Sequence, residues 1–342
     1  MKTVVFGPDK RTGVLHGEDV VDISRAYAKL IHERDGEGHP LELASALVPA
    51  DLERFIEAGD RALDNAEVAL EYLFGDVQDQ AGAIGEQLIH GSQSVQLHAP
   101  RPKGARVACA GGNFADHAQA MAERAALRGD MRAFEGDARE AIRNTGIWGF
   151  WKVDRESVAP DGSVIYPERC VRLDYEGELA IVISKQGKDI PADRVEDYIW
   201  GVTLLGDWSA RLTTEPGPLK FALQKNFDTC CSIGPCIAVR EVNPFDIEVE
   251  TLVNGERRQH YSTRDMVFSF GEYLEHLSRD FTFYPGDMIS GGTAAGTAAD
   301  ASPLLDDNTP SPEYFLKPGD TVEIVSPKVG TLRAHIVAKE AK

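Results

Sequence analysis

The 342-residue sequence is poor in positive charge, with 36 Lys and Arg against 55 Asp and Glu and a formal net charge of -19 at pH 7. Proteins that bind nucleic acid or an anionic membrane surface need clustered Lys and Arg, so we expect neither partner. A small anionic substrate stays compatible with this charge, because a metal ion and a few basic side chains can reverse the local field.

Long apolar segments and a cysteine framework are also missing. No apolar run approaches the ~20 residues that span a bilayer, and the N-terminus has no signal-peptide core. The five cysteines are an odd number without CxxC spacing. Packing thiols, such as the adjacent Cys230 and Cys231, therefore fit better than disulfides or redox pairs. We expect a cytoplasmic protein.

The composition, 42% hydrophobic and 27% charged, is ordinary for a globular protein with one large domain and a small companion. Residues 1–95 combine short strand patterns with a helical pattern over 24–74, which predicts a small α+β N-terminal domain. After a Pro-containing linker, residues 103–342 are β-rich and should form the second, larger domain. The predicted fold class is therefore α+β, β-rich.

Two glutamates precede the apolar, β-branched run 179–183, which reads as a buried strand. Glu176 and Glu178 are two residues apart, so a strand would place them on one face. Burying two unpaired carboxylates costs roughly several kcal/mol per ion, and a hard divalent cation would remove that cost. Exposure to water at the start of the strand explains the spacing equally well, so a third ligand is needed.

Asp207 ends a second buried strand beside a tryptophan and can supply that third oxygen. Arg211 follows within a turn, as an anion clamp or an ion-pair partner. Two glycines at 111–112 separate a strand from a helix and let the backbone turn tightly, which projects His117 toward a pocket. A structural hydrogen-bonding role for this histidine explains its place at least as well. A dinucleotide fingerprint is absent.

Two further segments are candidates for a functional role. The polar segment 118–147 predicts a lid-like insertion of one or two helices, or an inert surface excursion. A Gly-rich loop follows a strand near residue 290, and its amides, together with the Thr293 hydroxyl, could hold a carboxylate.

Taken together, these stretches resemble the motifs of the fumarylacetoacetate hydrolase superfamily, in the family's order. Asp-Tyr-Glu-x-Glu-Leu matches residues 174–179, and Asn-Asp-x-Ser-Ala-Arg matches 206–211 with glycine for asparagine. Gly-Asn-Tyr-x-x-His matches 112–117 with Phe114 for tyrosine. Weaker matches lie at 224–229 and 285–293, and the resemblance spans residues 107 to about 338.

The resemblance implies a mixed β-sandwich roll, usually a homodimer. It also implies Mg²⁺ or Mn²⁺, with Ca²⁺ acceptable to the same ligands, held by Glu176, Glu178 and Asp207. By the same resemblance, Lys225 and Arg211 would stabilise an oxyanion or bind the substrate carboxylate, and His117 would be the general base. The substrate-binding residues would be Thr293, Gly292, Lys152 and Phe114.

The chain departs from the family pattern beside the histidine. Many hydrolases of the family pair it with a glutamate one helical turn later, where this chain has Ala120, and Glu123 lies too far along the helix to reach back. A glutamine that some hydrolases carry is replaced by Thr214. Which carboxylate pairs with His117 is therefore open.

Three functions compete. The first is a metal-dependent hydrolase that cleaves a C–C bond in a β-diketo acid, of the acylpyruvate or fumarylacetoacetate type, in catabolism of aromatic compounds or sugar acids. The second is an isomerase, decarboxylase or dehydratase that acts on a 2-oxo or 2-hydroxymuconate-type acid through the same enolate chemistry. The third, a metal-binding protein without catalysis, is disfavoured because His117, Arg211 and Lys225 accompany the metal ligands.

Overall fold

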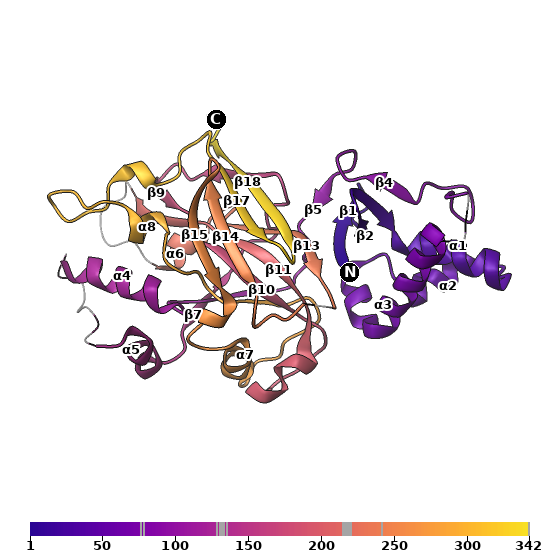
Figure 1. The fold of residues 1–342 in the computed structure, drawn as a ribbon, viewed down its shortest axis with the longest axis horizontal. Coiled ribbons are helices and arrows are strands. Elements are labelled where there is room, and N and C mark those ends of the chain that lie inside the picture. The colour runs from indigo at the N-terminus through magenta and orange to yellow at the C-terminus, as the bar shows by residue number, and fades with distance from the viewer. Residues whose placement is uncertain are drawn as a thin grey trace.

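An 11-stranded sheet runs through the whole molecule (Figure 1). The computed structural model describes all residues except 76, 78, 128, 130–133, 135, 214–220, 241 and 341–342. In spatial order the strands of this sheet are β4 (Ile89–Gly91), β3 (Asp19–Asp22), β2 (Arg11–His16), β1 (Lys2–Phe6), β13 (Cys231–Ala238), β11 (Ile199–Asp207), β10 (Gly177–Ile183), β16 (Met288–Ser290), β6 (Val107–Ala110) and β7 (Gly149–Lys152), with β5 (Leu97–His98) paired to β1.

A second sheet of five strands packs across the middle of the first. Its order is β15 (Glu256–Ser262), β14 (Glu248–Val253), β17 (Thr321–Ser326), β18 (Gly330–Ala338) and β8 (Gly162–Tyr166), and β9 (Cys170–Asp174) pairs separately with β12 (Ser209–Thr213). Leu179, Ile181, Val249 and Ile324 are buried between the layers. The predicted β-rich α+β class is confirmed.

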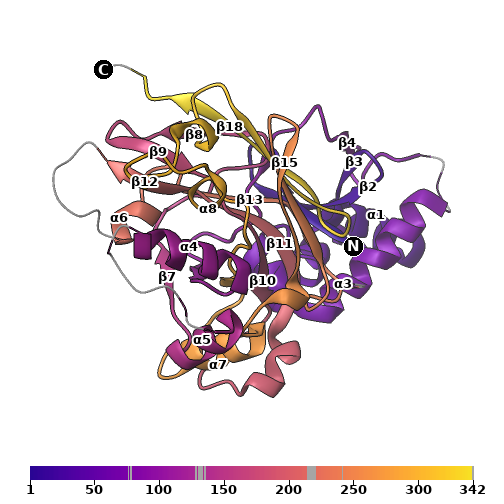
Figure 2. The ribbon, with the colours of Figure 1, turned by 60° about the vertical axis from the view of Figure 1, so that its left-hand side comes forward.

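Helices cover the ends of this sandwich rather than its middle. They are α1 (Ile23–Asp35), α2 (Pro40–Leu47), α3 (Leu52–Gly75), α4 (Ala115–Leu127), α5 (Ala138–Thr145), α6 (Phe221–Lys225), α7 (Phe270–Ser278) and α8 (Ala298–Ala301), with 3₁₀ turns η1 (Ala192–Tyr198), η2 (Thr263–Asp265) and η3 (Pro312–Tyr314). Figure 2 shows α4, α6 and α8 on one side and α1 and α3 on the other. None of the described helices is long and apolar enough to cross a bilayer.

The helical pattern predicted over 24–74 forms α1, α2 and α3, and α3 is kinked at Gly59, whose φ is 60°. Gly36, at φ 71°, ends α1, and Pro40 begins α2, the two positions that these residues favour. The N-terminal region is not a separate sheet, because β1 pairs with β13, with Lys2 opposite Ala238. The division at residue 95 stays a prediction, and the sheet continues across it.

Two reciprocal hydrogen bonds determine where α7 begins. The Ser269 side chain accepts from Glu272 N, and the Glu272 carboxylate accepts from Ser269 N. This capping box fixes the start of α7 at Phe270. The predicted insertion 118–147 contains most of α4 and all of α5, and its residues 128, 130–133 and 135 lie outside the described part.

Strand pairing brings motifs that are distant in the sequence to the same end of neighbouring strands of the main sheet. In the β10–β11 pair, Gly177 lies opposite Gly206 and Glu178 opposite Leu205. In the neighbouring pairs, Ser290 of β16 lies opposite Ala180 of β10 and beside β6. The ends of β6, β10, β11 and β16 therefore converge, together with the loops that follow β6 and β16.

Candidate active site

Three acidic side chains meet at this end of the strands, as the sequence predicts. Glu176 immediately precedes β10, Glu178 lies on it, and Asp207 ends β11. The residues are 4%, 1% and 0% exposed, so none is a solvated surface carboxylate. Asp207 N also donates to Glu176 O at 2.9 Å, which ties the two segments together.

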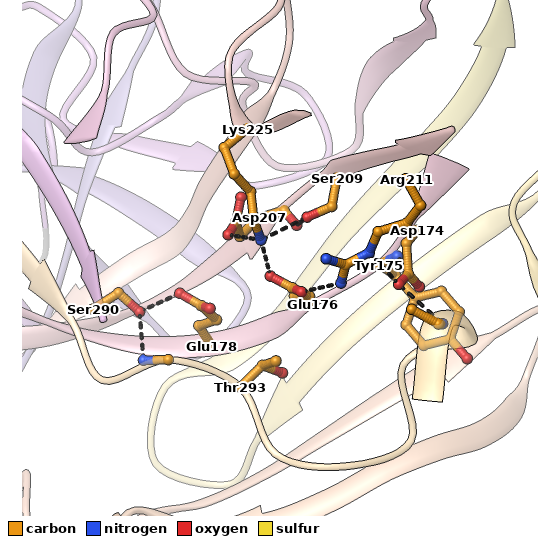
Figure 3. Close-up of polar contacts among 12 residues, drawn as sticks. Asp174, Tyr175, Glu176, Glu178, Asp207, Ser209, Arg211, Lys225, Ser290 and Thr293 are labelled. Atoms are coloured by element: carbon orange, nitrogen blue, oxygen red, sulfur yellow. Dashed lines mark hydrogen bonds and ion pairs between the residues drawn. The ribbon is translucent and has the colours of Figure 1, made fainter. Parts of the chain in front are cut away.

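Two lysine ammonium groups lie among these carboxylates. Lys225 Nζ donates to Glu176, to Asp207 Oδ2 at 2.7 Å and to Ser209 Oγ at 2.7 Å (Figure 3). Lys152, fully enclosed, pairs with the other oxygen of Asp207 and donates to backbone carbonyls. The carboxylates thus already surround positive charge, the environment that a cation would need.

The three carboxyl groups differ in their pKa. Burial would raise the pKa of Glu176, but Lys225 and Arg211 outweigh it and hold that pKa well below the ordinary value. Burial and the neighbouring carboxylates of Asp207 and Glu176 raise the pKa of Glu178 well above it. Burial also raises the pKa of Asp207, and Lys152 and Lys225 only partly compensate. Glu176 is therefore the most acidic of the three, and Glu178 and Asp207 are the two whose charged form burial disfavours.

Arg211 lies on β12, and its guanidinium donates hydrogen bonds to two carboxylates. Its Nε donates to Asp174 Oδ2 at 2.9 Å and its Nη2 donates to Glu176. Asp174 is fully buried and also accepts from the amides of Ala298 and Ala299, at 2.7 and 3.1 Å. Asp174 therefore joins the arginine to the first turn of α8.

The carboxylate partner of His117 is Asp300, which the sequence reasoning did not find. His117 lies in the first turn of α4, and its Nδ1 is 2.6 Å from Asp300 Oδ2 on α8. Gly296 N donates to the other oxygen of Asp300 at 2.9 Å. Glu123 instead accepts a hydrogen bond from Gln119 on its own helix. A His–Asp pair of this kind holds Nδ1 protonated and leaves Nε2 as the basic nitrogen.

The residues present fit a divalent cation. Carboxylate oxygens suit hard ions, and Asp207 Oδ1 accepts no hydrogen bond from the described residues although Lys152 pairs with it. Cys109 Sγ and one carboxylate oxygen each of Glu178 and Asp207 lie within 4.8 Å of one another, so all three could contact one ion. Burial raises the pKa of the Cys109 thiol well above its ordinary value, so the carboxylates remain the better ligands.

Counting the network of ionisable side chains supports the same conclusion. Five carboxyl groups and three cations form it, so with every carboxyl ionised negative charge exceeds positive by two, the charge of one divalent ion. The members are Asp174, Glu176, Glu178, Asp207, Asp300, Lys152, Arg211 and Lys225.

The carboxylates open into a cavity of about 420 Å³, within the usual size range for small-molecule sites. The predicted residues that line it are His117, Glu176, Glu178, Arg211, Lys225 and Thr293. The structure therefore brings the proposed base, both cationic side chains and two of the three carboxylates to one space.

The other predicted substrate-binding residues lie differently. Phe114 is 1% exposed and packs edge-on against Tyr261 in the core, outside the cavity wall. Gly292, at φ 86°, passes close to Ala110 O, where a Cβ would come within 3.1 Å. Lys152 pairs with Asp207 and does not line this cavity.

Thr293 lines the cavity, but its hydroxyl is engaged within the protein. It donates to Gly177 O at 3.0 Å and accepts from Gln259 Nε2 at 2.8 Å. Thr214, the position of the missing glutamine, lies outside the described residues.

Comparisons with known proteins identify the family of this chain. Residues 106–337 match the family model described as fumarylacetoacetate (FAA) hydrolase C-terminal. The oxaloacetate tautomerase YisK of Bacillus subtilis is 30% identical over 326 residues, 94% of each chain. A 5-carboxymethyl-2-hydroxymuconate delta-isomerase structure from Mycobacterium smegmatis is 30% identical, with TM-score 0.57, over 74% of this chain and 86% of that one.

A third protein is similar to this chain in fold only. The maleylpyruvate hydrolase of Sphingobium sp. SYK-6, solved with manganese(II) and pyruvate, has TM-score 0.65 at 22% identity, over 99% of this chain and 100% of that one. The named relatives thus include a tautomerase, an isomerase and a hydrolase. From the family model and the relative that matches along nearly the whole chain, the protein belongs to the fumarylacetoacetate hydrolase superfamily.

Proposed function

We propose that the protein is a divalent-metal-dependent enzyme that moves a proton at C3 of a 2-oxo acid, a tautomerase or isomerase. The observation that carries this proposal is the pairing of His117 with Asp300, because His117 lines the same cavity as Glu176 and Glu178. Two relatives at 30% identity support it, because the reactions in their names move protons without cleaving a carbon–carbon bond.

The proposed metal ligands are Glu176, Glu178 and Asp207, and Mg²⁺ or Mn²⁺ suits their oxygen donors. The manganese in the maleylpyruvate hydrolase structure supports the choice. When bound, the ion would supply Lewis-acid polarisation of the substrate's keto and carboxylate oxygens. Lys225 would shift from bridging two of the ligands toward the substrate, because one cation replaces another among the same oxygens.

The chain's own residues would position the substrate and carry the proton. Arg211 and Lys225 line the cavity. They would hold the C1 carboxylate and the developing enolate oxygen. Because the Thr293 hydroxyl is already engaged, its contribution would come from the backbone of the Gly-rich loop. Nε2 of His117 would accept the C3 proton, while Asp300 stabilises the resulting imidazolium.

Hydrolysis of an acylpyruvate is the second candidate, and the same pair favours it. The sequence lacks the family's lid glutamate, but Asp300 supplies a carboxylate for His117. A histidine oriented in this way could activate a water molecule as readily as it removes a carbon-bound proton. The two functions differ in the products, not in the residues.

The test is a panel of oxaloacetate, 2-oxobutanoate and acetylpyruvate, incubated in D₂O with Mg²⁺ or with chelator and followed by NMR and mass spectrometry. We expect Mg²⁺-dependent deuterium entry at C3, above the rate with free Mg²⁺ alone, without fragmentation. Release of two acids from acetylpyruvate would establish the hydrolase instead. The absence of both reactions would overturn the proposal.

A further inference from the structure

We propose that the natural substrate of this site carries an apolar substituent beyond C3, rather than a second carboxylate. The inference rests on the proposed function, since it concerns what the same site selects. It comes from the distribution of charge over the cavity wall. We call the part lined by Glu176, Glu178, Arg211 and Lys225 the floor, and the apolar part opposite in chemistry the roof.

The two halves of the cavity have different chemistry. The charged side chains that line it, together with His117, all belong to the site described above. The roof is formed by small and apolar side chains from α4, α5 and neighbouring segments, and its larger members are Met121, Phe134, Ile142, Trp148, Phe150 and Phe221. A 2-oxo acid whose C1 and C2 oxygens bind the floor would therefore direct its remaining atoms toward apolar surface.

An aromatic wall forms one side of the roof. The Trp148 and Phe221 rings are 5.7 Å apart at 65°, and Phe221 meets Phe150 at 5.1 Å and 76°. The Trp148 indole lies against Gly111, where a Cβ would come within 2.5 Å of the ring. Trp148 and Phe221 remain 45% and 39% exposed. These edge-to-face rings leave apolar area that a bound hydrocarbon group would cover.

No described cation is placed to receive a second carboxylate in the roof. Arg211 and Lys225 already pair with Glu176. The described arginines of the roof helices, Arg124, Arg139 and Arg143, donate to backbone carbonyls and do not line the cavity. A dicarboxylate would have to place its second charge against apolar side chains without a partner, which is unfavourable, or leave the roof uncovered.

The size of the effect follows from apolar transfer. Each methylene buried against the roof should raise kcat/KM about three- to fourfold, until the cavity is filled. Two methylenes should therefore give about a tenfold gain. The discrimination against a charged group should be larger than that, because a lone charge is not compensated in apolar surroundings.

The test compares C3 deuterium exchange with Mg²⁺ for 2-oxobutanoate, 2-oxohexanoate and 2-oxooctanoate against oxaloacetate. We expect kcat/KM to rise about tenfold from the first to the second acid and to exceed that of oxaloacetate. Exchange that is fastest for oxaloacetate and flat along the series would overturn the inference while the proposed function stands. No exchange with any acid would instead remove the proposed function.

Matched variants on α4 locate the effect. Ala125 lines the roof, whereas its neighbour Ala126 is not among the lining residues. Ala125→Leu should reduce the preference for 2-oxooctanoate over 2-oxobutanoate about tenfold, while Ala126→Leu should leave that ratio unchanged. Equal ratios in both variants would contradict the assigned position of the substituent.

A binding readout does not depend on turnover. 2-Oxooctanoate should quench tryptophan fluorescence in the wild type, and Trp148→Phe should remove most of that quenching. Quenching that survives this change would place the substituent elsewhere.

Discussion

Replacing Asp300 by asparagine should separate catalysis from folding and metal binding. The carboxylate accepts from Gly296 N at 2.9 Å and lies 2.6 Å from His117 Nδ1. The isosteric amide can keep the first hydrogen bond through its oxygen. Its NH₂ group then faces Nδ1, which must become an acceptor, so the proton moves to Nε2 and the nitrogen that faces the substrate loses its basicity.

The expected loss is that of a general base in the wrong tautomer. Such catalysis contributes about 10²- to 10⁴-fold, so kcat for C3 exchange should fall by that factor, or ~3–5 kcal/mol in activation free energy. Mg²⁺ affinity, measured by calorimetry, should change by less than about threefold, because Asp300 is not one of the proposed ligands.

Asp306→Asn, at an exposed position six residues further along the chain, is the matched control and should behave as wild type. An Asp300→Asn enzyme with kcat within about threefold of wild type would refute the proposed role of the pair. A variant that also loses Mg²⁺ would show that Asp300 acts through the metal site rather than through His117.

Three further changes test other parts of the account. Glu176→Ala should abolish metal binding and activity, because it removes a ligand and leaves Asp207 as the one carboxylate of the three that pairs with Lys225. Calorimetry with Mg²⁺ measures this directly, and normal affinity would exclude Glu176 as a ligand. Asp174→Asn should lower the free energy of unfolding by ~3 kcal/mol, because it removes the negative charge that pairs with Arg211. A decrease of less than about 1 kcal/mol in a urea titration would contradict this. Ser269→Ala should cost ~1 kcal/mol through loss of the α7 cap, with C3 exchange unchanged.

Local signals in the sequence were sufficient for much of the fold. The alternation over 248–253 and the Asn-Gly turn predict a hairpin, and β14 occupies Glu248–Val253 with β15 directly after the turn. His117 was likewise placed correctly in the first turn of a helix, because a glycine pair precedes it. Each of these features depends on residues close together in the chain.

Contacts between distant segments could not be predicted in this way. Asp300 lies 183 residues from His117, and its only local signal is an acidic residue among alanines after a Gly-rich loop. Cys109 lies beside the carboxylates only because β6 pairs with β16 and β16 pairs with β10. Phe114 follows the family motif, yet its ring turns into the core. A homodimer and a moving lid stay predictions.

The most direct test of the central claim is deuterium incorporation at C3 of 2-oxobutanoate, measured by NMR in D₂O. The comparison is between wild type with Mg²⁺, wild type with chelator, and His117→Gln with Mg²⁺. The account predicts that only the first incorporates a single deuterium on one face of C3, because one imidazole carries the proton. Equal exchange with chelator, or in His117→Gln, would contradict it.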